Sequence, residues 1–135
     1  MRTILLIEED DETRRLLSRN LRDYGYRVIA AHDEADALER GGDDARADLI
    51  LVDLVGESAE SGLEAGRRVR ERARYDVRTP LVAMPERYGK EVEGTEVNVA
   101  GNDWVFYLGE EPGQLRNFLS RLLPPRPGPT AQRVS

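Results

Sequence analysis

The segment Leu49-Ile50-Leu51-Val52 is wholly apolar and is followed directly by Asp53. A continuous apolar run of this length is typical of a strand buried on both faces of a parallel sheet. Similar runs occur at Ile4–Ile7, Leu81–Met84 and Trp104–Tyr107, and a weaker strand is predicted at Arg27–Ala31. The chain therefore carries the strands of a parallel sheet.

Helical stretches lie between these strands. They are predicted at Glu12–Asp23, Glu34–Arg40, Leu63–Ala73 and Gln114–Leu123. In the last of them, Leu115, Phe118, Leu119 and Leu122 form an apolar stripe at i, i+3, i+4, i+7. Alternation of strands and helices, joined by right-handed crossovers, predicts an α/β fold with a doubly wound, five-stranded parallel sheet.

Two segments depart from this regular pattern. Glu86–Gly101 should hold the fourth crossover helix, but it contains Gly89 and Gly94. Each glycine costs a helix ~1 kcal/mol, and the β-branched residues around them add to that cost, so an irregular crossover is predicted. Residues 124–135 are rich in proline and are predicted to be a flexible tail or linker that follows a domain of residues 1–123.

Composition excludes several classes of function. The 135 residues suit one domain, and 20 basic against 26 acidic side chains give a net charge of −6. This balance argues against binding of nucleic acid or of an anionic membrane. The chain has no cysteine and a single histidine, His32, to which no chemistry is assigned. Its N-terminal apolar run is too short for a signal peptide, so a cytoplasmic protein is expected.

Acidic side chains follow two of the central strands. Glu8 and Glu9 come directly after the first strand and Asp53 after the third. Ligands bind outside the carboxyl ends of the strands in an open parallel sheet. Three carboxylates gathered at this edge repel one another unless a cation lies among them, and oxygen ligands favour Mg²⁺.

The same residues resemble the receiver domain of two-component response regulators. Glu8-Glu9 is similar to the acidic pair of that family, and Ala47–Leu54 is similar to the strand that carries its phosphoacceptor. Further similar motifs are Tyr24–Val28, Ala35–Leu38, Thr79–Val82 and Ala100–Asp103, so the resemblance covers residues 2–123. It implies a flavodoxin-like sheet with the strand order 2-1-3-4-5.

The resemblance also implies the roles of the site residues. Asp53 would accept a phosphoryl group from a histidine kinase. Glu9, Asp53 and the backbone carbonyl of Val55 would coordinate Mg²⁺, and Glu8 would act through a metal-bound water. In such a site the metal holds the acceptor carboxylate and neutralises charge during phosphoryl transfer.

Two positions depart from the family pattern. Pro85 stands where the family has the Thr or Ser that binds the phosphoryl group, and it is followed by Glu86 where the residue is usually small. Leu108, or Tyr107 with a one-residue shift, stands where the family has lysine, and the only lysine of the chain is Lys90 in the fourth crossover. The resemblance is therefore to an atypical receiver, with weak Mg²⁺ binding and still weaker retention of phosphate.

Three functions stay open at this point. The first is an atypical receiver in a phosphorelay, with Asp53 as phosphoacceptor; the second is a pseudo-receiver that acts as a phosphorylation-independent interaction module. The third is a small metal-dependent α/β enzyme that uses Glu8, Glu9 and Asp53. Expected partners are a histidine kinase or another signalling protein, and a homodimer through the fourth crossover, the fifth strand and the last helix.

Overall fold

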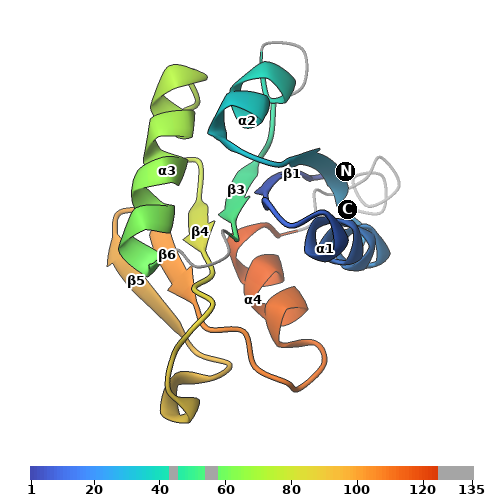
Figure 1. The fold of residues 1–135 in the computed structure, drawn as a ribbon, viewed down its shortest axis with the longest axis vertical. Coiled ribbons are helices and arrows are strands. Elements are labelled where there is room, and N and C mark those ends of the chain that lie inside the picture. Colours follow the sequence, from blue (N-terminus) through green and yellow to red (C-terminus); the bar gives the residue numbers. More distant parts are fainter. Residues whose placement is uncertain (43–45, 54–57, 125–135) are drawn as a thin grey trace, which may run out of the picture.

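The computed structural model describes residues 1–42, 46–53 and 58–124. These residues form a six-stranded sheet with helices on both faces (Figure 1). The elements are β1 Thr3–Ile7, α1 Asp11–Asp23, β2 Arg27–Ala31, α2 Glu34–Arg40, β3 Leu49–Val52, α3 Ala59–Arg72, β4 Leu81–Ala83, the 3₁₀ helix η1 Lys90–Val92, β5 Glu96–Ala100, β6 Asp103–Phe106 and α4 Gln114–Leu122. Apart from Pro124, the predicted proline-rich tail lies outside the described residues.

The strand order is β2-β1-β3-β4-β6-β5. The first five strands in this order run parallel to their neighbours, whereas β5 pairs with β6 in the antiparallel sense. The doubly wound α/β class and the predicted order of the five parallel strands are therefore confirmed. The sixth strand, β5, differs from the prediction, since it adds an edge to the sheet beside β6.

The fourth crossover is irregular, as predicted. In place of a helix it forms η1, then turns at Gly94, whose φ of +77° favours glycine, and continues into β5. A two-residue turn at Gly101-Asn102 then reverses the chain into β6, with Ala100 opposite Asp103. Glycine at the first central position suits such a turn, and Gly101 has a φ of +51° there.

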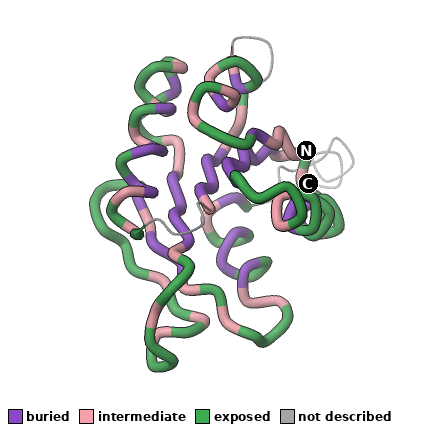
Figure 2. Tube along the Cα trace, viewed as in Figure 1, coloured by how far each residue is buried: buried purple, intermediate pink, exposed green. Residues whose placement is uncertain are grey.

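Two apolar layers cover the sheet. On one face, Leu6 and Leu51 pack with side chains of α1 and α4, and on the other Ile7 and Val52 pack with those of α2 and α3. The buried strands form the centre of the molecule in Figure 2. Leu16 of α1 does not join either layer and is 58% exposed.

The arginine-rich helix α3 is held by ion pairs within the protein. Arg67 Nε and Arg70 Nη1 both donate to the carboxylate of Asp103, at 2.8 Å and 2.6 Å, and Arg68 pairs with Glu34. These ion pairs connect α3 to β6 and to α2. Within the described residues no helix is long and apolar enough to cross a membrane.

Candidate functional site

The carboxyl ends of three neighbouring strands form the site. The backbone N–H of Asp53 donates to Ile7 O at 2.8 Å, and that of Met84 donates to Val52 O at 2.9 Å. These bonds continue the parallel pairing one residue beyond β1, β3 and β4. Glu8 and Asp53 are therefore placed side by side at the predicted edge of the sheet.

Glu8 is a buried acid. Its side chain is fully shielded from solvent, its Oε1 accepts the backbone N–H of Asp10 at 3.0 Å, and its Oε2 has no hydrogen-bond partner among the described residues. Burial, together with the adjacent Asp53 carboxyl, raises the pKa of Glu8 to about 8. The uncharged form of Glu8 is thus favoured near neutral pH.

Asp53 belongs to the same coupled pair. Burial raises the pKa of Asp53, the Glu8 carboxyl beside it offsets part of that rise, and the negative charge of Glu86 adds to it. Two adjacent carboxyl groups release their protons as a pair, because the charge of one opposes ionisation of the other. A bound cation would reverse this effect by favouring both carboxylates.

Glu9 does not join this pair, because its side chain is exposed. The described residues contain no group of three acidic or histidine side chains placed to hold a metal ion, so the expected cluster of Glu8, Glu9 and Asp53 is not formed. The predicted ligand Val55 lies outside the described residues. The candidate Mg²⁺ ligands among the described residues are therefore the carboxylate oxygens of Glu8 and Asp53, which are of the kind that a hard cation prefers.

The positions that depart from the family pattern lie beside this pair. Pro85 follows Met84 at the end of β4 and offers neither a hydroxyl nor an N–H donor. Glu86 lies close enough for its charge to raise the pKa of Asp53. Leu108 is 41% exposed, and its backbone carbonyl accepts a hydrogen bond from the hydroxyl of Tyr88.

Tyr88 is a residue of the site that the sequence did not reveal. Its ring meets that of Tyr107 edge to face at 5.4 Å, and its hydroxyl bonds to Leu108 O. Burial raises the pKa of Tyr88, and the negative charges of Glu93 and Asp53 raise it further. An aromatic residue in a polar crossover is the only signal that the sequence offers for it.

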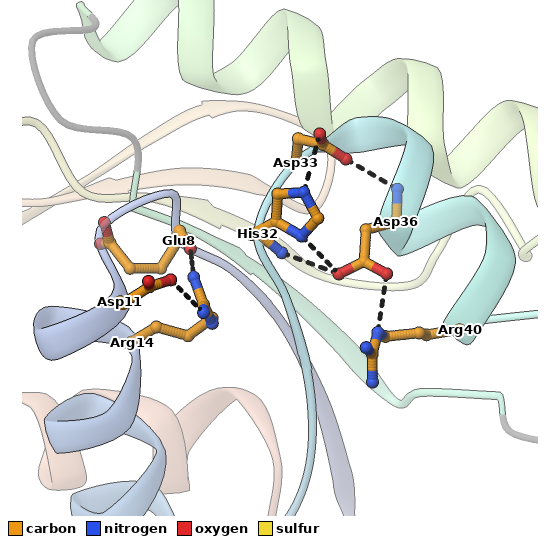
Figure 3. Close-up of polar contacts among 7 residues, drawn as sticks. All are labelled: Glu8, Asp11, Arg14, His32, Asp33, Asp36 and Arg40. Carbon is orange, nitrogen blue, oxygen red and sulfur yellow. Dashed lines mark hydrogen bonds and ion pairs between the residues drawn. The ribbon is translucent and has the colours of Figure 1, made fainter.

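Arg14 supports the backbone at Glu8. Its Nη1 donates to Glu8 O at 2.9 Å, and its Nη2 pairs with Asp11 at 2.5 Å (Figure 3). The same figure shows His32 bonded through Nδ1 to Asp36 at 3.0 Å at the start of α2. His32 therefore contributes to the beginning of a helix, and it lies in a cluster that does not include Glu8 or Asp53.

The aromatic side chains of β6 do not form an exposed patch. Phe106 is buried, and Trp104 packs edge to face on Phe118 of α4 with ring centroids 5.5 Å apart. Because β5 covers the edge of β6, the residues of the predicted partner surface that remain exposed include Val97 and Val99 of β5.

Comparison with solved structures identifies the fold. The chemotaxis protein CheY4 of Vibrio cholerae is 26% identical with a TM-score of 0.67, over 91% of this chain and 99% of that one. The receiver domain of the sensor histidine kinase PA1611 from Pseudomonas aeruginosa, solved with a magnesium ion coordinated in its active-site cleft, is 25% identical with a TM-score of 0.59, over 90% and 96%.

The chain is also similar in sequence to a transcriptional regulatory protein. The uncharacterized transcriptional regulatory protein YkoG of Bacillus subtilis is 27% identical over 119 residues, which are 88% of this chain and 48% of YkoG, so the chain spans about half of that relative. No family model matches the sequence. In its strand order, in the paired acids at the sheet edge and in these similarities, the chain resembles the CheY-like receiver domains of response regulators.

Proposed function

We propose that this receiver domain acts in two-component signalling as an interaction module whose output does not depend on phosphorylation of Asp53. The observation that carries the proposal is the surroundings of Asp53, where the charge of Glu86 raises its pKa. A phosphoryl group brings about −1.5 to −2 further charges, and neither Pro85 nor Leu108 has a side-chain donor to receive them.

Two side chains of the fourth crossover could in principle donate to a phosphoryl group, namely those of Tyr88 and Lys90. Tyr88 donates its hydroxyl proton to Leu108 O, so this donor is engaged at the end of β6. Lys90, the only lysine, is exposed in η1. The groups that bind and sense a phosphoryl group in the family thus have no evident replacement among the described residues.

Treatment of the full chain with acetyl phosphate and Mg²⁺ tests this proposal. We expect intact-mass spectrometry to show incomplete phosphorylation at most, absent from Asp53→Asn, and we expect the backbone amide signals of β4 and β6 to stay in place. Nearly complete phosphorylation of Asp53, accompanied by large shifts across both strands, would overturn it.

A slow phosphoacceptor is the second candidate, because Asp53 and Glu8 keep their places at the ends of β3 and β1. The receiver domain of PA1611 holds a magnesium ion in its cleft, and we propose weak Mg²⁺ binding here through Glu8 and Asp53. When bound, the metal would neutralise charge at the acceptor carboxylate. A histidine kinase would then be the phosphoryl donor.

The surface formed by η1, β5, β6 and α4 is the proposed place of contact with a signalling partner or a second copy. Val97 and Val99 are each 48% exposed on the edge strand, where unpaired backbone groups favour association. Val97→Glu should weaken self-association in sedimentation velocity, whereas Val77→Glu, at a site 80% exposed outside this surface, should not. Equal self-association of the two variants would contradict the assignment of this surface as the place of contact.

A further inference from the structure

A cavity between α1 and β2 lies outside the acidic site. Its volume is about 400 Å³, within the range of small-molecule pockets. It is lined by Asp11, Arg14, Arg15, Ser18 and Arg22 of α1 and by Ala30 of β2. Asp11, Arg15, Ser18 and Arg22 are spaced i, i+4, i+7 and i+11, which brings them to one face of the helix.

The charges around this cavity are unbalanced. Arg14 is paired with Asp11, and its other nitrogen donates to Glu8 O. The guanidinium groups of Arg15 and Arg22 make no hydrogen bond or ion pair with any described residue. Two guanidinium groups thus remain uncompensated at the cavity of a protein whose net charge is −6.

A buried hydroxyl lies between them on the helix. Ser18 is only 4% exposed, and its Oγ has no hydrogen-bond partner among the described residues. A buried polar group without a partner is costly and calls for an explanation. Rotation of the Ser18 side chain toward the cavity would let its hydroxyl donate to a bound oxygen atom.

We propose that this cavity binds a small anionic ligand through a phosphate or carboxylate group held by Arg15, Arg22 and Ser18. The planar guanidinium group matches the oxygens of both anions with paired hydrogen bonds. The cavity is larger than one such group, which points to a small organic anion. Because Arg14 lines the cavity and also bonds to Glu8 O, a ligand there would contact a residue that supports the acidic site (Figure 3).

Calorimetric titration of the full chain with inorganic pyrophosphate and with citrate, in metal-free buffer, tests the proposal. We expect at least one of the two anions to bind, and their ranking separates phosphate from carboxylate ligands. Arg15→Gln combined with Arg22→Gln should weaken binding by about tenfold or more, because each charge-assisted hydrogen bond contributes more than a neutral one. Ser18→Ala should weaken it by a smaller factor.

Arg19→Gln is the matched control, since Arg19 lies on the same helix but does not line this cavity. It removes the same charge and should leave binding nearly unchanged. Absence of binding by both anions, or an equal loss of affinity in Arg19→Gln and the double variant, would overturn the proposal. Thermal unfolding of each variant shows whether the fold is intact.

Discussion

Glu8 and Asp103 are both buried acids, but their partners differ. Glu8 lies beside the Asp53 carboxyl, and its pKa is raised to about 8. Asp103 accepts hydrogen bonds from Arg67 and Arg70, and these partners lower the pKa of Asp103 even though burial alone would raise it. The two acids therefore affect stability in opposite directions as the pH changes.

Glu8 should make the fold less stable as the pH rises. Its pKa is above the ordinary value of 4.5 when the protein is folded, so its contribution is complete below pH 4.5 and is lost as the pH rises through about 8. The loss should be on the order of a few kcal/mol, since each pKa unit corresponds to about 1.4 kcal/mol. Urea unfolding between pH 5 and pH 9 in metal-free buffer measures it, and the slope should flatten in Glu8→Gln. Equal slopes in both proteins would contradict the assignment.

Asp103→Asn should destabilise the fold by about 1–3 kcal/mol, because two guanidinium groups lose a charged, buried partner. The wild-type contribution of Asp103 should be present above pH 3.8 and lost as the pH falls through its lowered pKa. Asp76→Asn is the control: it removes the exposed ion pair with Arg78 and should change the free energy of unfolding much less than Asp103→Asn does. Urea denaturation at pH 7 compares the two, and equal losses would contradict the role of Asp103.

At the scale of the element, α3 lies close to β4 because of Gly66. A Cβ on Gly66 would come within 2.2 Å of Leu81 Cδ1, and Leu81 is fully buried. Gly66→Ala should therefore destabilise the protein by about 1–3 kcal/mol despite the better helix propensity of alanine. Chemical denaturation measures the free energy of unfolding of Gly66→Ala, Leu81→Ala and the double variant. Gly66→Ala should lower this free energy by less in the Leu81→Ala background than in the wild type. If the losses of the two single variants simply add up in the double variant, Gly66 and Leu81 do not pack against each other in this way.

Tyr88 connects the fourth crossover to Tyr107 and Leu108, the residues that follow β6. Tyr88→Phe keeps the ring contact with Tyr107 and removes the hydrogen bond to Leu108 O, so a loss of about 0.5–1.5 kcal/mol is expected. Amide hydrogen exchange should become faster in residues 89–95 and stay the same in β1, which the change does not touch. Unchanged amide hydrogen exchange throughout the crossover in Tyr88→Phe would show that the Tyr88 hydrogen bond does not stabilise it.

The fourth crossover also shows how far the sequence could predict an element. Gly89 and Gly94 correctly opposed a helix, because the cost of glycine is a local property. The strand β5 was missed although Val97 and Val99 alternate with polar residues and the two-residue Gly101-Asn102 segment follows. This pattern is a hairpin signal. The family pattern led to the expectation of a helix in this crossover, whereas the local alternation of residues indicates a strand.

For the whole molecule, the apolar runs were sufficient to predict the parallel sheet, and the family resemblance supplied its strand order. The site was less accessible to prediction. Glu8 and Asp53 could be placed from the strand ends, but the exposure of Glu9 depends on how the chain leaves β1, and the position of Tyr88 depends on the crossover. The pairing of Arg67 and Arg70 with Asp103 could not be predicted from the local sequence, because Asp103 is 33 to 36 residues away from them.

Titration of the full chain with beryllofluoride in the presence of Mg²⁺ tests whether the output depends on phosphorylation of Asp53. Trp104, the only tryptophan, lies in β6 and reports the response by fluorescence. We expect weak binding and little change in the wild type. Combining Pro85→Thr, Glu86→Ala and Leu108→Lys restores two donors and removes one charge, so affinity should rise by at least about one order of magnitude. Adding Asp53→Asn to this variant should abolish the gain. Tight Mg²⁺-dependent binding by the wild type, with a large fluorescence response, would contradict the account.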